Sequence, residues 1–376
     1  MSDAVLQTNA LSAGYSRRVI VDGLTVSVSA GAICTLIGPN GAGKSTVLKT
    51  VAAQLPMLSG SVALCGDSLD TLHEKDVARR LSVLLTQKIT AERMTCGDVA
   101  ETGRYPYTGT LGILSAEDKR IVHEAMELVG AAHLYDTDFR QISDGQRQCV
   151  MLARAIAQQP KLMLLDEPTS FLDIGHKLHI LSLLRRLAKE RQIAVIQSLH
   201  ELDLAQKFSD TVVCVHNGKA ERIGTPEEIF SGDYIASLYE IENGTYDPRF
   251  GAAEPAAVQG DPEVFVIGGG GAGIPVYRRM HRTGIPFAAG VLHENDVEYP
   301  IAKALASVVI TEKAFEPVGA KAVENASHVM KRCREVLCCT ETFGSMNQGN
   351  RMLKSQAEQL GILRPETEDA KKRAAR

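Results

Sequence analysis

A glycine-rich segment at residues 38–45 fits the spacing G-x-x-x-x-G-K-S, between strand-like sequence at 24–37 and helix-like sequence at 44–53. Glycines at such a junction let backbone N–H groups surround phosphate oxygens, and the helix N-terminus adds the positive end of its dipole. We expect Lys44 to contact the β- and γ-phosphates and Ser45 to offer its hydroxyl to Mg²⁺. The predicted nucleotide-binding residues here are Gly38, Pro39, Asn40, Gly41, Ala42, Gly43, Lys44, Ser45 and Thr46.

Two adjacent carboxylates, Asp166 and Glu167, end the apolar run at 161–167. An apolar strand would deliver Asp166 rigidly to the magnesium site, while Glu167 could face the attacking water. Two acids at a strand end could also be a solvated turn, just as the glycine-rich segment alone could be a turn with a surface lysine. Their occurrence together favours ATP hydrolysis.

A third motif, Ile-Ser-Asp-Gly-Gln at 142–146, precedes the acidic strand and leads into a helix-like segment. It resembles the signature Leu-Ser-Gly-Gly-Gln of ATP-binding cassette (ABC) ATPases, and residues 1 to about 248 carry the other markers of that family in family order. By this resemblance Tyr15 stacks on adenine, Gln87 bridges magnesium to a transport partner, and His200 senses the γ-phosphate. Each of these three, taken alone, would more often be an ordinary packing or polar residue.

The resemblance implies a homodimer in which two copies meet head to tail. ATP would lie between the phosphate loop of one copy and Ser143, Gly145 and Gln146 of the other, with Asp173 in the loop that crosses the dimer. A serine at a helix N-terminus suits this role, because its hydroxyl and the free N–H groups can donate to the γ-phosphate. Asp144 departs from the family pattern, which has glycine there. Its side chain could lie away from the phosphate or weaken closure by like charge.

A finer resemblance concerns the partner. The segments 103–130, 166–187 and 198–230 resemble ATPases that serve importers of iron–siderophore complexes, haem and cobalamin. This implies membrane permease subunits, an extracytoplasmic substrate-binding protein, and a peripheral place on the cytoplasmic side of the membrane. The alternative is a soluble ATPase that acts on a cytosolic assembly. The net charge of −4 argues against nucleic acid as the partner.

The strand-like and helix-like segments around these residues predict an α/β protein. The length of 376 residues indicates more than one domain, and the 44% of hydrophobic residues is enough for globular cores. No run approaches the ~18 apolar residues of a membrane helix. The eight cysteines are scattered, which favours reduced thiols, and the group Cys333, Cys338 and Cys339 lacks paired C-x-x-C spacing. We expect an ABC ATP-binding domain with a helical subdomain at 1–248, a linker at 249–261, a Rossmann-like domain at 262–361, and a charged, disordered tail at 362–376.

The Rossmann-like domain is expected because strand-like and helix-like segments alternate from Glu263 onward, which is typical of a parallel sheet. Gly268, Gly270 and Gly273 fit G-x-G-x-x-G, and Glu294 falls near the place of a ribose-binding acid. These four residues form a candidate second ligand site whose ligand the sequence does not identify. The other interpretations are glycines that only allow close packing, a regulatory sensor, or a module that stabilises the dimer.

Overall fold

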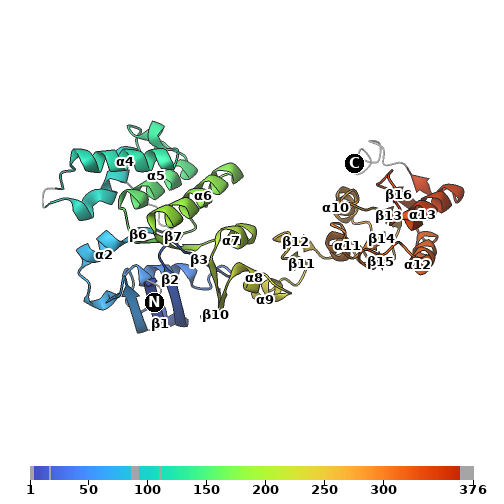
Figure 1. Cartoon of the computed structure of the whole chain (residues 1–376), viewed down its shortest axis with the longest axis horizontal. Helices are drawn as coiled ribbons and strands as arrows, with labels where there is room; N and C mark the ends of the chain where they lie inside the picture. The colour runs from blue at the N-terminus through green and yellow to red at the C-terminus, as the bar shows by residue number, and fades with distance from the viewer. Residues whose placement is uncertain (1–3, 17, 86–92, 110–111, 365–376) are drawn as a thin grey trace. The chain divides into compact units, whose positions relative to one another are not determined.

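The chain folds into two compact units, Met1–Tyr239 and Glu240–Arg376, in the computed structural model (Figure 1). Each unit has its own sheet and its own hydrophobic core. In the part of the chain that the structure describes, no helix is long and apolar enough to cross a membrane. The described residues are 4–16, 18–85, 93–109 and 112–364.

The first unit is built on a ten-stranded sheet in the order β5-β4-β1-β2-β10-β9-β3-β8-β7-β6. β9, β3, β8, β7 and β6 run parallel, whereas β1, β2, β4 and β5 pair antiparallel at the other end. β3, β7 and β8 are completely buried, as strands covered on both faces are. The strands are β1 (Ala4–Tyr15), β2 (Arg18–Ser29), β3 (Ile33–Ile37), β4 (Ser59–Leu64), β5 (Asp67–Ser68), β6 (Leu81–Leu84), β7 (Leu162–Asp166), β8 (Ala194–Ser198), β9 (Thr211–His216) and β10 (Lys219–Gly224).

The helices of the first unit include a helical subdomain, α3 to α5, beside the sheet (Figure 1). Capping boxes at Thr95, Ser115 and Ser143 start α3, α4 and α5, because each side chain accepts from the backbone N–H three residues on. The helices are α1 (Lys44–Val51), η1 (Leu69–Thr71), α2 (Glu74–Arg80), α3 (Cys96–Glu101), η2 (Thr102–Tyr107), α4 (Ala116–Leu128), η3 (Ala132–Leu134), α5 (Asp144–Ala157), α6 (Ile174–Arg191), α7 (Leu202–Phe208), α8 (Pro226–Ile229) and α9 (Tyr234–Leu238).

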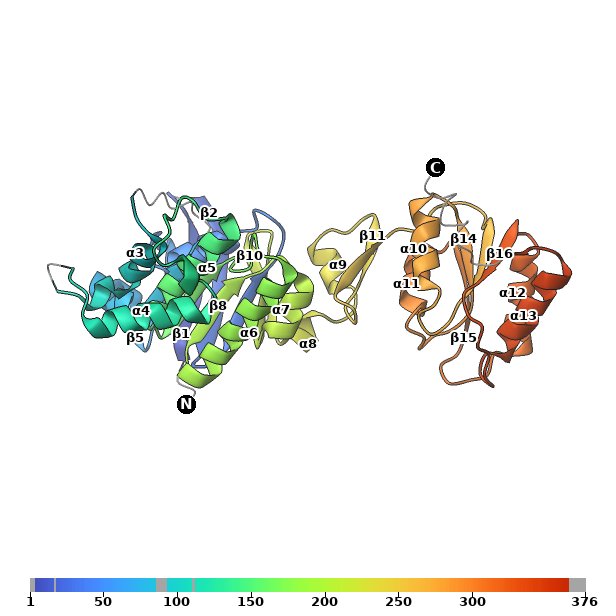
Figure 2. The same cartoon turned by 90° about the horizontal axis from the view of Figure 1, so that it is seen from above.

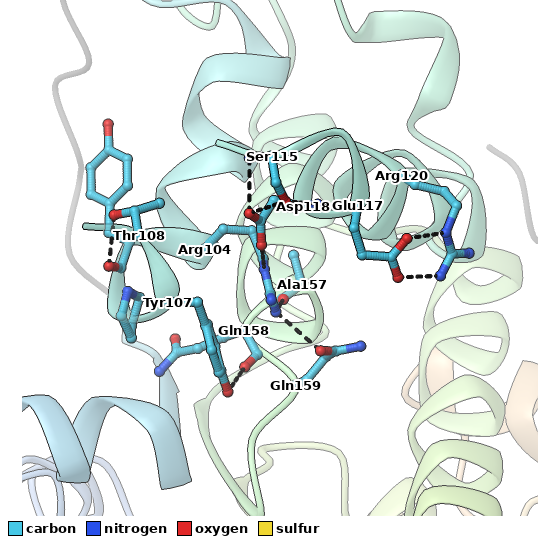
Figure 3. Close-up of polar contacts among 12 residues, drawn as sticks. Arg104, Tyr107, Thr108, Ser115, Glu117, Asp118, Arg120, Ala157, Gln158 and Gln159 are labelled. Atoms are coloured by element: carbon cyan, nitrogen blue, oxygen red, sulfur yellow. Dashed lines mark hydrogen bonds and ion pairs between the residues drawn. The ribbon is translucent and has the colours of Figure 1, made fainter. Parts of the chain in front are cut away.

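A buried arginine ties the helical subdomain together (Figure 3). The Arg104 Nε donates to Asp118 Oδ1 at 2.8 Å, its Nη1 donates to the Ala157 carbonyl at 2.8 Å, and its guanidinium lies 4.1 Å from the centre of the Tyr107 ring. Asp118 also closes the capping box of α4, since its Oδ2 accepts from the Ser115 N–H at 3.0 Å. The same oxygen accepts from the Ser115 hydroxyl at 2.6 Å. One guanidinium therefore joins the start of α4 to the end of α5, the helix that carries the predicted signature motif.

The second unit contains a five-stranded, fully parallel sheet in the order β15-β14-β13-β16-β17. Its two hydrophobic clusters lie on opposite faces of the sheet, one built with α10 and α11 and the other with α12 and α13 (Figure 2). This is the doubly wound arrangement that the sequence predicted. The elements are β13 (Val264–Ile267), α10 (Ile274–Arg282), β14 (Phe287–His293), α11 (Tyr299–Leu305), β15 (Val308–Glu312), α12 (Ala320–Met330), β16 (Glu335–Cys338), α13 (Gln348–Gln359) and β17 (Leu363–Arg364).

The structure differs from the sequence-based boundaries at both ends of this unit. Part of the expected linker at 249–261 forms β12 (Ala252–Pro255), which pairs with β11 (Gly244–Asp247). This hairpin is tied to α10 by the Arg278–Glu254 ion pair, so its residues belong to the second unit. The expected tail at 362–376 begins with β17, which pairs with β16. The sequence does not indicate these two short strands, because a strand of two to four residues is too short to show a hydrophobic periodicity.

We predict that Arg104→Ala lowers the free energy of opening of α4 by about 3 kcal/mol, because it leaves the partly buried Asp118 and the Ala157 carbonyl without their donor. Hydrogen exchange of the α4 amides measures this change. Arg120→Ala is the matched control, since Arg120 pairs with Glu117 on the exposed face of the same helix and should cost about 0.5 kcal/mol or less. Equal small losses in both variants would contradict the structural role of Arg104.

Candidate active site

The phosphate loop and the acids Asp166 and Glu167, with His200, lie at the carboxyl ends of three adjacent parallel strands, β3, β7 and β8. β8 lies between the other two, and its last residue, Ser198, is in register with Leu36 of β3 and Asp166 of β7. The loop at 38–43 follows β3, and Glu167 follows β7. The carboxyl edge of a parallel sheet is the usual place for a ligand site, because the loops that leave it converge there.

The loop at 38–43 owes its shape to its glycines. Gly38 has φ +144°, and a Cβ there would lie 2.0 Å from the Val215 carbonyl oxygen of β9. Gly43 has φ +108°, and a Cβ there would meet Val21 at 2.4 Å. Within the described residues no side chain caps α1 at Gly43. Its first N–H groups are therefore left for an anion.

Lys44 already points into this loop. Its Nζ donates to the carbonyl oxygens of Gly38 at 2.7 Å and Pro39 at 3.0 Å. Burial lowers the pKa of the Lys44 ammonium, while the nearby carboxylates of Glu167 and Asp166 act in the opposite direction. A buried cation at the mouth of an amide-lined loop is suited to a polyphosphate.

The two acids of β7 have different surroundings. Asp166 is buried, and its Oδ1 accepts from the Ser198 hydroxyl at 2.7 Å. Glu167 is partly exposed in left-handed backbone with φ +52°, and its Oε1 lies 2.6 Å from Nε2 of His200. The Ser170 hydroxyl donates to Glu167 Oε2 at 2.8 Å. Asp166 is thus held rigidly inside the sheet edge, whereas Glu167 faces the loops, as a residue that orients water must.

The signature motif begins α5. The Ser143 Oγ accepts from the Gln146 N–H at 3.2 Å, and Gln146 Oε1 accepts from the Ser143 N–H at 2.9 Å. Ser143 is exposed, and its hydroxyl proton stays available to an incoming oxygen. The hydrogen bonds of Ser143 and Gln146 thus run to each other rather than to the phosphate loop of the same chain.

α5 also contacts the loop after Glu167. A Cβ on Gly145 would lie 3.0 Å from the Phe171 carbonyl oxygen, so this glycine allows α5 to pack against the loop. Gln148 of α5 donates to the Glu167 carbonyl at 3.1 Å. Asp173 caps α6 by accepting from the His176 N–H at 2.9 Å. The start of α5, which carries Ser143, Gly145 and Gln146, therefore packs against the loop after β7 of its own chain.

The remaining predicted residues are less informative. Tyr15 is half-exposed at the end of β1, and Thr46 is buried in α1. Gln87 lies outside the described residues. Sequence reasoning missed Ser198, Ser170 as a partner of Glu167, and Tyr239, whose hydroxyl accepts from the Gly38 N–H at 3.0 Å. The neighbouring ends of β7 and β8 could have indicated Ser198, but no sequence signal indicates Tyr239.

The second glycine-rich loop departs from expectation, because the chain's own carboxylates fill it. Glu298 is fully buried, and its Oε1 accepts from the N–H groups of Gly269 at 2.9 Å and Gly273 at 2.6 Å. Its Oε2 accepts from the Tyr277 hydroxyl at 2.7 Å. Asp296 accepts from the Gly270 N–H at 3.0 Å. The N–H groups that would hold a pyrophosphate are occupied by anions of the protein itself.

The loop amides bind Glu298 and Asp296 rather than Glu294, the acid predicted to bind a ribose. Glu294 is exposed, and its N–H donates to the Glu312 carbonyl at 3.0 Å. Gly268 and Gly273 are glycines because a Cβ on either would lie within 2.6 Å of Glu298 or Tyr277 atoms. Only Gly270 faces open space, beside a cavity of about 250 Å³. The residues of this loop do not fit a dinucleotide.

Comparison with known proteins gives two family matches along the chain. Residues 21–170 match the family described as ABC transporter. Residues 287–375 match the MJ0874 family. This second match begins at β14, so β13 and the second glycine-rich loop lie outside it.

Relatives align over most of their length. The chain is 40% identical over 280 residues to the uncharacterized ABC transporter ATP-binding protein MJ0873 of Methanocaldococcus jannaschii, covering 73% of this chain and 96% of that one. It is 38% identical over 245 residues to the iron(3+)-hydroxamate import ATP-binding protein FhuC of Bacillus subtilis, covering 65% and 91%. It is 33% identical over 292 residues to the cobalamin import ATP-binding protein BtuD of Halobacterium salinarum, covering 76% and 73%.

The alignments with MJ0873 and BtuD cover more of the chain than the first unit contains, so these relatives also share part of the second unit. Among solved structures, the fold resembles a metal-chelate type ABC transporter in an inward-facing conformation, with TM-score 0.54 and 24% identity over 62% of this chain and 88% of that one. It also resembles the dimeric cassette MJ0796, with TM-score 0.53 and 22% identity over 59% and 98%. These two likenesses concern the fold alone.

We predict that Lys44→Ala weakens ATP binding by about 100-fold or more, because the charge-assisted contact of the buried Lys44 ammonium to phosphate is lost. Calorimetric titration of ATP into the variant measures the loss. Lys49→Ala is the matched control, since Lys49 lies in the last turn of the same helix, away from the loop, and should leave affinity unchanged. Equal affinities for the two variants would remove Lys44 from the site.

We predict that Glu298→Ala lowers the free energy of unfolding of the second unit by about 3 kcal/mol, because three buried donors lose their acceptor. Glu298→Gln should cost about 1 kcal/mol, since its amide oxygen can still accept from the two glycine N–H groups. Glu294→Ala, on the exposed acid, should stay within about 0.5 kcal/mol. Denaturant titration, with hydrogen exchange of the β13 amides as the readout, measures the loss of unfolding free energy in each of the three variants. A larger loss for Glu294→Ala than for Glu298→Ala would refute this account.

Proposed function

Because the chain is an ATPase of the ABC transporter family, we propose that it powers the import of a metal chelate, either an iron complex or cobalamin, through a membrane permease. The observation that supports this most is the alignment with FhuC over 91% of its length and with BtuD over 73%, both of which are import ATP-binding proteins. The sequence of the second unit does not distinguish one cargo from the other.

ATP binding begins at the loop at 38–43. The backbone N–H groups of the loop and the Lys44 ammonium donate to the phosphate oxygens. On binding, the ammonium leaves the carbonyl oxygens of Gly38 and Pro39 and contacts the β- and γ-phosphates. Ser45 and Asp166 supply a hydroxyl and a carboxylate, the hard oxygen donors that Mg²⁺ prefers, and Gln87 is the third proposed ligand. A bound Mg²⁺ would neutralise phosphate charge. Tyr15, half-exposed at the end of β1, is proposed to stack on the adenine.

Hydrolysis is assigned to Glu167 and His200. Glu167 accepts a proton from the attacking water, or orients it, through the carboxylate that Ser170 and His200 hold in place. His200 lies at the end of β8, where its exposed imidazole can also reach a γ-phosphate. The backbone of Glu167 is fixed from both sides, because its N–H donates to Ser198 and its carbonyl accepts from Gln148.

The site of one copy is completed by a second copy. Ser143, Gly145 and Gln146 stand at the N-terminus of α5, where the free N–H groups and the helix dipole attract the γ-phosphate held by the partner. Apolar side chains beside the crossing loop support this contact, since Phe171 is 71% and Ile174 76% exposed. Closure then depends on the γ-phosphate, and its loss on hydrolysis releases the two copies.

The permease is proposed to dock at a hollow of about 480 Å³ between α2, η2 and α5. It is lined by Glu74, Lys75 and Ala78 on one side and by Tyr105 and Pro106 on the other. Tyr105 is 54% exposed, so an aromatic ring is available to a partner helix. Docking there would hold the ATPase at the cytoplasmic face of the membrane, with a substrate-binding protein on the opposite side.

Co-purification with a permease and transport in proteoliposomes test the importer role. Tyr105→Asp should abolish permease binding and keep ATP hydrolysis, whereas Ile223→Asp, at an exposed side chain of β10, should affect neither. Uptake of ferric siderophore or of cobalamin identifies the cargo. An ATPase that captures no permease and supports no uptake would instead be the soluble cassette acting on a cytosolic assembly, with the second unit as a sensor.

We predict that Glu167→Gln binds ATP but hydrolyses it ~10²–10⁴-fold more slowly, the usual range for loss of a general base. With Mg-ATP it should sediment and scatter light as a dimer, because the γ-phosphate persists between the copies. Glu201→Gln is the control, since Glu201 pairs with Lys177 and should leave turnover within about twofold. A Glu167→Gln variant that binds ATP and remains monomeric would contradict the head-to-tail dimer.

A further inference from the structure

A charged pair occupies the first turn of α5, beside the serine that would meet the γ-phosphate. The Nη1 of Arg147 donates to Oδ1 of Asp144 at 2.6 Å, across an i,i+3 step of the helix. The same guanidinium donates through Nη2 to the Arg140 carbonyl at 2.9 Å and through Nε to the Phe139 carbonyl at 3.3 Å. Arg147 is thus fixed by three acceptors that precede or begin the helix.

The backbone explains why an aspartate can stand at position 144. Asp144 is the first residue of α5, and its side chain is 57% exposed. Position 145, in contrast, has little space for a side chain, because a Cβ there would lie 3.0 Å from the Phe171 carbonyl oxygen. Of the two positions that carry glycine in the family signature, only the second requires it in this chain.

The aspartate nevertheless creates an electrostatic problem. It adjoins Ser143, so in the closed dimer its carboxylate approaches the γ-phosphate of the ATP held by the other copy. Like charges repel, and the repulsion grows as closure excludes water from between the copies. Arg147 supplies one positive charge at contact distance from this carboxylate, on the same helix turn.

We propose that Arg147 is a positioning residue that holds the Asp144 carboxylate back and neutralises it, and so permits ATP-driven closure in a chain whose signature carries an acid. This inference rests on the proposed head-to-tail dimer. The proposal predicts that removal of Arg147 weakens ATP-driven dimerisation only when Asp144 is present. A general structural role of Arg147 at the start of α5 would instead weaken dimerisation with or without Asp144.

A double-mutant cycle in the full chain tests this, with Glu167→Gln as the parent and light scattering against ATP concentration as the readout. Arg147→Gln should raise the ATP concentration for half-maximal dimerisation about tenfold. In the Asp144→Gly background the same change should have an effect of about twofold or less. Arg147→Lys, which keeps the charge, should recover part of the loss. Arg120→Gln, which removes an exposed paired arginine from α4, should have no effect in either background.

The outcomes are distinct. An Arg147→Gln effect that depends on Asp144 supports the proposal. Equal effects in the two backgrounds would overturn it and leave Arg147 as a structural residue that binds the Phe139 and Arg140 carbonyls. A parent variant that binds ATP and never self-associates would overturn the dimer itself, and this inference with it.

Discussion

The chemistry of the first unit depends on the register of three parallel strands. β8 lies between β3 and β7, and Ser198 at its end stands opposite Leu36 and Asp166. This alignment brings the glycine-rich loop at 38–43 to the same edge as the buried Asp166 and the proposed catalytic Glu167, although the loop lies more than a hundred residues before these two acids in sequence. The Ser198 hydroxyl couples them directly, since it donates to Asp166 and accepts from the Glu167 N–H. A slip of one residue in β7 would turn Asp166 to the other face of the sheet.

The two glycine-rich loops have similar sequences and opposite electrostatics. Both follow a central buried strand and start a helix, and both present backbone N–H groups that attract an anion. In the first, the cation Lys44 points into the loop and contacts its carbonyl oxygens, which suits a phosphate ligand. In the second, Glu298 and Asp296 provide the anions from within the chain, and Tyr277 adds a third donor to Glu298. The glycine spacing specifies an anion-binding backbone, and the neighbouring side chains decide whether a ligand or the protein satisfies it.

α5 connects the two halves of the proposed dimeric site within each chain. Its start carries Ser143 and Gln146, which are proposed to face a second copy, and Gln148 in the same helix donates to the Glu167 carbonyl. Gly145 lets the helix rest against the loop at 170–173. Arg104 anchors the far end of the same helix through the Ala157 carbonyl. α5 is thus hydrogen-bonded near both of its ends, to the Glu167 carbonyl and to the Arg104 guanidinium.

The sequence by itself determined the elements whose signals are local. Local spacing, capping and periodicity predict the phosphate loop at 38–45, the acidic end of β7, the serine at the start of α5, and the alternation of strands and helices after Glu263. The tertiary structure decided what depends on long-range contact: Ser198 and Tyr239 as partners of the site, the hairpin β11–β12, and Glu298 rather than Glu294 at the second loop. Glu294 and Glu298 are four residues apart and chemically identical. Only the path of the chain after β14, which buries one and exposes the other, assigns the amides of the loop to Glu298.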